Sequence, residues 1–90
     1  SQLLLPGDTV VDIGANVGAH TVPLARLVGP TGRVFAFEPQ RPLFYCLCTN
    51  VVLNGLTNVV CRQEALGDKT GHIPIPEVDY NQPGNFGGLA

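Results

Sequence analysis

One feature constrains the fold of this 90-residue chain more than any other: a β-branched run followed by two glycines, Gly14 and Gly18, that are four positions apart. Residues 9–13, Thr-Val-Val-Asp-Ile, follow a Pro-Gly-Asp turn and stop at Gly14, a pattern typical of a buried parallel strand. Gly18 closes the loop, and apolar residues then recur at helical spacing from near Gly18 up to Gly29. A strand that passes through a glycine loop into a helix is the first unit of an open α/β sheet.

The rest of the chain alternates strands and helices in the same way. Residues 33–38 have strand character and end at Pro39, because the residue before a proline favours extended geometry. Residues 42–53 predict a helix that stops at an Asn-Gly pair, and residues 58–62 predict a third strand. Residues 71–76 can form only an edge strand, because their prolines cannot donate to a central sheet ladder.

These elements predict an α/β fold, a Rossmann-like, doubly wound and mainly parallel sheet. We expect residues 1–90 to be a single partial domain, with a βαβαβ core at residues 6–66 and an edge strand and loop at residues 67–90. Residues 85–88, Asn-Phe-Gly-Gly, are predicted to be a loop or a flap. With only three parallel strands, the strand at residues 9–13 would be an unpaired edge, apolar on both faces, which predicts association or poor stability.

Charge and composition argue against several classes of partner. Five basic and seven acidic residues give a net charge of −2 without a basic stripe, so we expect no nucleic-acid partner. No apolar run reaches the roughly 18–20 residues that a membrane span needs, so we expect no membrane partner. The three cysteines, Cys46, Cys48 and Cys61, lack zinc-site spacing, which predicts free thiols, a cytoplasmic protein and no metal.

The candidate site lies at the carboxyl ends of the predicted strands, where ligands of open parallel sheets bind. Asp12 and the loop at residues 14–18 lie at the end of the first strand, where glycines and a helix N-terminus let a ligand approach the backbone. Glu38 lies twenty positions beyond Gly18, a position from which a carboxylate accepts hydrogen bonds from ribose hydroxyls. Residues 64–68 follow the third strand, near where an adenine ring would lie.

Nicotinamide dinucleotides and S-adenosylmethionine are both bound by a glycine loop followed by an acidic residue. The dinucleotide fingerprint is Gly-x-Gly-x-x-Gly, whereas this loop is Gly14-x-x-x-Gly18. Asp12 would repel a pyrophosphate but could balance the ammonium of a methionine moiety, so the charges favour a zwitterionic ligand with an adenosine. An NAD(P)-dependent oxidoreductase domain and a non-catalytic fragment that binds an adenosine ligand remain the alternatives.

Longer motifs surround these residues: 6–18 (Pro-Gly-Asp-Thr-Val-Val-Asp-Ile-Gly-Ala-Asn-Val-Gly), 32–39 (Gly-Arg-Val-Phe-Ala-Phe-Glu-Pro), Asn50, Asn54 and 65–68 (Ala-Leu-Gly-Asp). Together they resemble the FkbM family of S-adenosylmethionine-dependent methyltransferases. The resemblance implies S-adenosyl-L-methionine as cofactor and a seven-stranded class I methyltransferase sheet, of which this sequence holds the first half. It also implies O-methylation of a sugar or secondary-metabolite hydroxyl, with a small-molecule or glycan acceptor and any catalytic base held by later segments. The 90 residues alone would then be inactive.

The resemblance also implies a set of cofactor-binding residues, but no catalytic residue. Glu38 would hold the ribose hydroxyls, with Pro39 next to it, and Thr21 would support the loop. The other members line the methionine and ribose part, or flank the adenine: Asp12, Gly14, Ala15, Asn16 and Gly18 for the former, Ala65 and Leu66 for the latter.

Four polar residues have a simpler structural explanation. His20 and His72 are predicted to be structural or incidental, the first because a helix N-terminus disfavours an imidazolium. Glu64 could contact the adenosine or merely end a strand. Asn16 also suits a tight loop because asparagine tolerates left-handed geometry, which is compatible with a role in binding.

Overall fold

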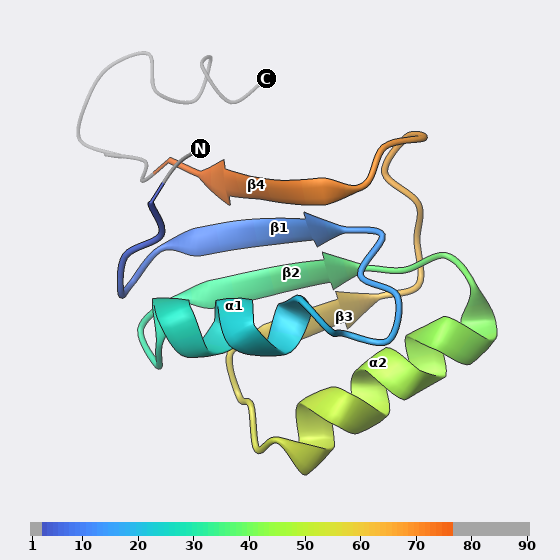
Figure 1. Ribbon diagram of the computed structural model, residues 1–90, viewed down its shortest axis with the longest axis horizontal. Helices are drawn as coiled ribbons and strands as arrows, with labels where there is room; N and C mark the ends of the chain where they lie inside the picture. The colour runs from blue at the N-terminus through green and yellow to red at the C-terminus, as the bar shows by residue number, and fades with distance from the viewer. Residues whose placement is uncertain (1–2, 77–90) are drawn as a thin grey trace.

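A single four-stranded sheet with two helices makes up the computed structural model, which describes residues 3–76 (Figure 1). The element bounds are β1 Thr9–Ile13, α1 Thr21–Val28, β2 Arg33–Phe37, α2 Arg41–Leu53, β3 Val59–Arg62 and β4 Gly71–Ile75. Each predicted element is therefore present, with bounds that differ from the prediction by at most three residues. The predicted loop at residues 85–88 lies outside the described residues.

The sheet has the strand order β3-β2-β1-β4. β1 and β3 both pair with β2 in parallel, and Val10 of β1 faces Val34 of β2 across the ladder. These two strand–helix–strand crossovers are the predicted α/β arrangement, and they place the carboxyl ends of three strands at one edge of the sheet.

The prediction of an unpaired β1 edge is wrong. β4 pairs antiparallel with β1, with Val10 opposite Pro74 and Asp12 opposite His72. The loop after β3 carries the chain across the carboxyl ends of the parallel strands, so β4 returns along the free side of β1 (Figure 1). β4 is an edge strand of the sheet, as predicted, because Pro74 has no backbone N–H to donate to a further strand.

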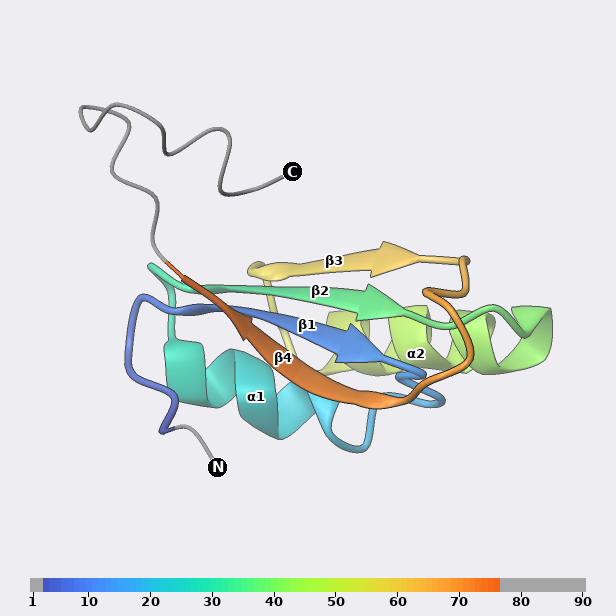
Figure 2. The ribbon, with the colours of Figure 1, turned by 90° about the horizontal axis from the view of Figure 1, so that it is seen from above.

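Both helices cover the same face of the sheet (Figure 2). Alternate strand residues point to that face, and they form two small cores with the helices. One core joins Leu24, Ala25 and Val28 of α1 to Val10 and Val34 of the strands, and the other joins Leu47 and Val51 of α2 to Ala15 and Ala36. The cores anchor both helices, so the loops at their N-termini are fixed against the strand ends.

The helix at residues 21–28 begins three residues later than predicted. Gly18 has a φ of 94°, which is left-handed and breaks the helix before Thr21. Pro23 then falls in the first turn, where its missing N–H costs no helical hydrogen bond. The residues between Gly14 and Thr21 are consequently free to form the loop of the candidate site.

No helix within residues 3–76 is long and apolar enough to cross a membrane.

Candidate functional site

Asp12 is fixed at the carboxyl end of β1 by the helix that follows. Its side chain points to the helix-covered face, where the residue is 2% exposed. The hydroxyl of Thr21, at the start of α1, donates to Asp12 Oδ2 over 2.6 Å. The predicted support of the loop by Thr21 therefore takes the form of a hydrogen bond to a buried carboxylate, and such charge-assisted bonds are strong.

Glu38 lies directly after β2 and is 4% exposed. Its Oε1 accepts the backbone N–H of Asn16 at 2.7 Å, and its Oε2 accepts that of Gln40 at 2.9 Å. The carboxylate thus ties the glycine loop to the start of α2. Two backbone donors take the place of a cationic partner for this buried charge.

The loop itself is held from three sides. The backbone N–H groups of Gly14 and Ala15 both donate to the carbonyl of Phe37 at 2.9 Å. The amide of Asn50, on α2, donates to the carbonyl of Val17 at 2.6 Å. Asn16 has a φ of 57°, the left-handed geometry that its residue type predicts. The loop is therefore rigid before any ligand binds, and the backbone N–H groups of all five residues 14–18 already have hydrogen-bond partners within the protein.

A cavity of about 340 Å³ opens beside this loop. Its lining combines the end of β1, the loop, the start of α1 and the start of β4. The residues are Asp12, Ile13, Gly14, Ala15, Asn16, Ala19, His20, Thr70, Gly71 and His72. Four predicted site residues are thus brought together in one cavity, whereas Gly18 is buried and faces Leu47.

The other predicted residues lie at the neighbouring strand ends. Pro39 follows β2, and the side chain of Gln63, just after β3, donates to its carbonyl at 3.4 Å. Ala65 and Leu66 are exposed in the loop beyond, with Leu66 40% exposed. Glu64 pairs with Arg62 at 2.6 Å on the surface. These positions are compatible with the predicted adenine contacts.

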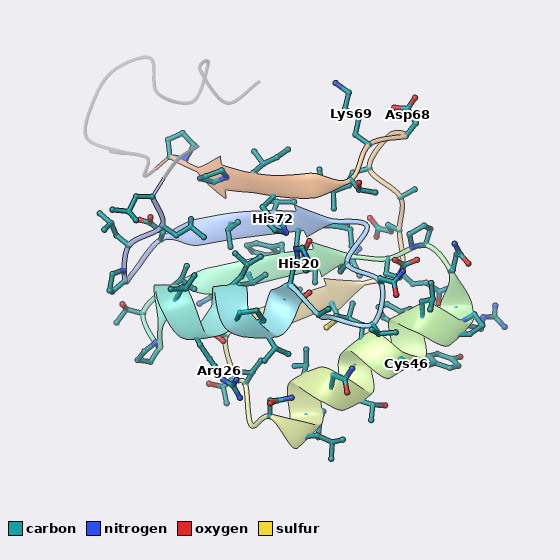
Figure 3. The ribbon with its side chains drawn as sticks, viewed as in Figure 1. His20, Arg26, Cys46, Asp68, Lys69 and His72 are labelled. Atoms are coloured by element: carbon teal, nitrogen blue, oxygen red, sulfur yellow. The ribbon has the colours of Figure 1, made fainter. Side chains whose placement is uncertain are left out.

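Sequence reasoning missed the contribution of β4 to the cavity. His72 comes from this strand, and its Nε2 lies 3.1 Å from Nδ1 of His20 and 3.7 Å from Oδ1 of Asp12. Figure 3 shows the two imidazole rings next to each other at the start of α1. The two residues are 52 positions apart, so only the pairing of β4 with β1 could have revealed their contact.

The thiols are free, as predicted, but one of them is chemically distinct. Burial raises the pKa of Cys61 to about 11, and the adjacent Cys48 thiol adds to the shift. Cys46 is exposed on α2 (Figure 3). Among residues 3–76, no cluster of three His, Cys, Asp or Glu side chains is arranged to hold a metal ion.

Solved structures match this geometry. A SAM-dependent methyltransferase from Aquifex aeolicus superposes with a TM-score of 0.66 at 31% identity, over 69% of this chain and 33% of that one. A putative rRNA methylase from Clostridium thermocellum gives a TM-score of 0.67 at 33% identity, over 69% and 35%. The chain has the class I methyltransferase fold. The part matched in these methyltransferases is about a third of each.

Curated relatives include three transferases. The catalytic subunit of tRNA (adenine(58)-N(1))-methyltransferase from Cryptococcus neoformans is 38% identical over 71 residues, 72% of this chain and 16% of that protein. A tRNA(Phe) (4-demethylwyosine(37)-C(7)) aminocarboxypropyltransferase from Methanocaldococcus jannaschii is 40% identical over 53 residues, 59% of this chain and 21% of that protein. An arsenite methyltransferase from Halobacterium salinarum is 32% identical over 78 residues, which are 87% of this chain and 19% of that protein. The chain thus spans about a fifth or less of these relatives.

No protein-family model matches the chain, so the FkbM resemblance stays a prediction. The exclusion of nucleic acid as a partner is wrong, because two of these relatives act on tRNA. The error has a physical cause. The net charge of −2 was counted over 90 residues, whereas about four fifths or more of each tRNA-modifying relative lies outside the matched part, so the charge of this chain alone does not decide whether the whole protein binds phosphates.

Proposed function

We propose that this chain is the cofactor-binding part of an S-adenosyl-L-methionine-dependent methyltransferase. The observation that carries the proposal is the placement of two buried carboxylates, Asp12 and Glu38, on either side of one rigid glycine loop. They lie at the carboxyl ends of adjacent parallel strands, where this type of sheet binds nucleoside ligands. Solved methyltransferases that are more than 30% identical share the arrangement of these strands.

Asp12 in the cavity and Glu38, which lies outside the cavity on the other side of Asn16, fit the amino-acid and ribose portions of this cofactor. Asp12 Oδ2 is used by Thr21, while Oδ1 has His72 at 3.7 Å, which is beyond hydrogen-bond distance. Oδ1 is therefore available to an ammonium group. Each Glu38 oxygen accepts one backbone N–H and keeps a further lone pair for a ribose hydroxyl.

The remaining predicted residues complete the proposed site. Gly14, Ala15 and Asn16 would line the methionine part of the bound cofactor. Gly18 would shape the loop from the side that packs on Leu47. The exposed apolar side chain of Leu66 would cover one face of the adenine ring, with Ala65 and Pro39 near it. Pro39 follows β2 and Ala65 follows β3, and these two strands are neighbours in the sheet.

The bound cofactor would supply an activated methyl group on its sulfonium, and the protein's part is alignment. Asp12 and Glu38 would hold the ligand on either side of its sulfonium, at the ammonium and at the ribose, so that the methyl group points in one direction. Rigidity of the loop keeps that direction constant, because the hydrogen bonds to Phe37 and Asn50 hold it before binding. The acceptor and any base would be held by other parts of the whole protein.

The acceptor proposed from the FkbM resemblance is a hydroxyl of a sugar or secondary metabolite. We also propose a cytoplasmic location, supported by the three free thiols. A panel of acceptors with radiolabelled S-adenosylmethionine would test the first point, and it should include tRNA and arsenite alongside glycans. Transfer to tRNA or arsenite without transfer to any hydroxyl compound would overturn the proposed acceptor class.

Ligand binding by the full-length protein tests the central proposal. S-adenosylhomocysteine should raise the thermal unfolding midpoint, whereas NADH should leave it unchanged. Protection by NADH alone would instead favour an oxidoreductase.

Asp12→Asn isolates the charge at the proposed ammonium site. The amide oxygen can still accept from Thr21, so the fold should persist while the negative charge is lost. We expect the Kd for S-adenosylhomocysteine, measured by calorimetry, to rise about tenfold or more. Asp68→Asn is the matched control, because Asp68 is exposed in the loop before β4 and projects away from the cavity (Figure 3). Equal Kd values for the two variants would contradict the role of Asp12.

A further inference from the structure

A chain of polar contacts runs along one wall of the cavity and joins three distant parts of the sequence. Thr21 Oγ1 donates to Asp12 Oδ2 at 2.6 Å, and Asp12 Oδ1 lies 3.7 Å from His72 Nε2. His72 Nε2 in turn lies 3.1 Å from His20 Nδ1. The two ring centroids are 5.0 Å apart and the ring planes are tilted by 58° (Figure 3). β1, the start of α1 and β4 therefore meet in one network.

The charge of Asp12 favours one assignment of the protons on the two rings. A hydrogen bond between two imidazole nitrogens requires one ring to donate and the other to accept. The carboxylate of Asp12 near His72 Nε2 favours the proton on that nitrogen, because a lone pair there would face a negative charge. In this assignment His20 Nδ1 is the acceptor and His20 Nε2 carries the N–H. His20 therefore offers an N–H donor at the cavity.

The cavity thus combines a donor and a negative charge on neighbouring residues. Asp12 is 3% exposed at its side chain, so its charge acts at short range inside the cavity rather than through solvent. A simple anion would be repelled by Asp12, and a simple cation would leave the His20 donor unused. A ligand that carries an ammonium and a carboxylate on one carbon satisfies both.

We propose that His20, held in place by His72, binds the carboxylate at the amino-acid end of the adenosyl cofactor while Asp12 takes its ammonium. The proposal rests on the proposed function and adds a specificity-determining residue to it. His72 is a positioning residue: its side chain is 36% exposed, and it acts by donating to His20 Nδ1. The adenosine portion of the ligand would make no contact with either imidazole.

Two ligands that differ only in the amino-acid end provide the test. S-adenosylhomocysteine carries the α-amino acid, and 5′-methylthioadenosine is the same adenosine thioether without it. Both Kd values are measured by calorimetry on the full-length protein. In His20→Ala, the Kd for S-adenosylhomocysteine should rise about tenfold or more, because a charge-assisted hydrogen bond is lost. The Kd for 5′-methylthioadenosine should change less than twofold, which also shows that the variant is folded.

Substitutions of His72 separate positioning from packing. His72→Ala should raise the Kd for S-adenosylhomocysteine severalfold, since His20 loses the donor that orients it. His72→Gln should restore most of the affinity, because the amide N–H can occupy the place of Nε2–H. If the histidines had a purely structural role, every variant would raise the Kd values of both ligands together.

The outcomes distinguish this inference from the proposed function. If the wild-type protein binds neither ligand, the proposed function fails and this inference fails with it. If it binds both, and His20→Ala weakens both equally or neither, the proposed function stands and the role of His20 is refuted.

Discussion

Replacement of Glu38 by glutamine should destabilise the protein, because this buried carboxylate holds the glycine loop. The Glu38 carboxylate is 4% exposed and accepts two backbone N–H groups, from Asn16 at 2.7 Å and from Gln40 at 2.9 Å. Glutamine keeps one acceptor oxygen but turns the other into an NH₂ group, which then faces a backbone donor. One charge-assisted bond, worth about 1.5–3 kcal/mol, is lost, and a buried donor is left without a partner at a further cost of about 1–3 kcal/mol. Partial relaxation of the loop leaves an expected loss of about 3 kcal/mol.

Thermal unfolding followed by circular dichroism measures this effect. In a domain of this size a loss of 1 kcal/mol lowers the midpoint by about 4–8 °C, so Glu38→Gln should lower it by roughly 12 °C or more. Glu64→Gln is the matched control, because Glu64 pairs with Arg62 on the surface at side-chain exposures of 47% and 57%. That pair is worth less than about 1 kcal/mol. If the two variants unfold within 2–3 °C of each other, roughly the resolution of the comparison, the loop does not depend on Glu38 as argued.

Three further predictions concern packing and thiol chemistry. Leu47 is fully buried against the glycine loop, so Leu47→Ala should lower the free energy of unfolding by about 2–5 kcal/mol in urea titrations. The control is Val52→Ala, because Val52 is 75% exposed on the same helix; this variant should change the free energy of unfolding by less than about 0.5 kcal/mol. Gly32→Ala should prevent folding at 37 °C, because an added Cβ would lie 2.5–2.6 Å from two carbonyl oxygens, and a normal circular dichroism spectrum at that temperature would contradict this. Mass spectrometry after a pulse of iodoacetamide at pH 8 should find Cys46 alkylated long before Cys61. Burial and a neighbouring thiol raise the pKa of Cys61 to about 11, so its thiolate accumulates only at higher pH. Equal labelling rates of the two cysteines at pH 8 would refute the protected position of Cys61.

The local pattern of the chain was enough to predict the parallel part of the fold. Pro39 ends β2 and Gly29 follows α1 because proline and glycine restrict or extend backbone geometry within one or two residues. The β-branched run at residues 9–13 predicted a buried strand, and Val10 within it is fully buried. The helix start was wrong by three residues because the left-handed geometry of Gly18 belongs to the loop rather than to the helix.

The candidate site divides in the same manner. The sequence predicted that Asp12 and Glu38 lie close together because each ends or directly follows a strand, and parallel strands bring their carboxyl ends together; the structure places both beside the glycine loop. What the sequence could not show is that Glu38 supports the loop through backbone N–H groups, since these bonds depend on the fold of the loop itself.

By itself the sequence determined the order of strands and helices, the position of the glycine loop and the two carboxylates, because these follow from interactions between residues near one another in the chain. The tertiary structure alone decided where β4 lies and therefore which residues share the cavity. Antiparallel pairing of β4 with β1 brings His72 to His20 and Asp12. Residues separated by 52 positions leave no periodic trace of their contact, so the histidine pair became visible only when the sheet was assembled.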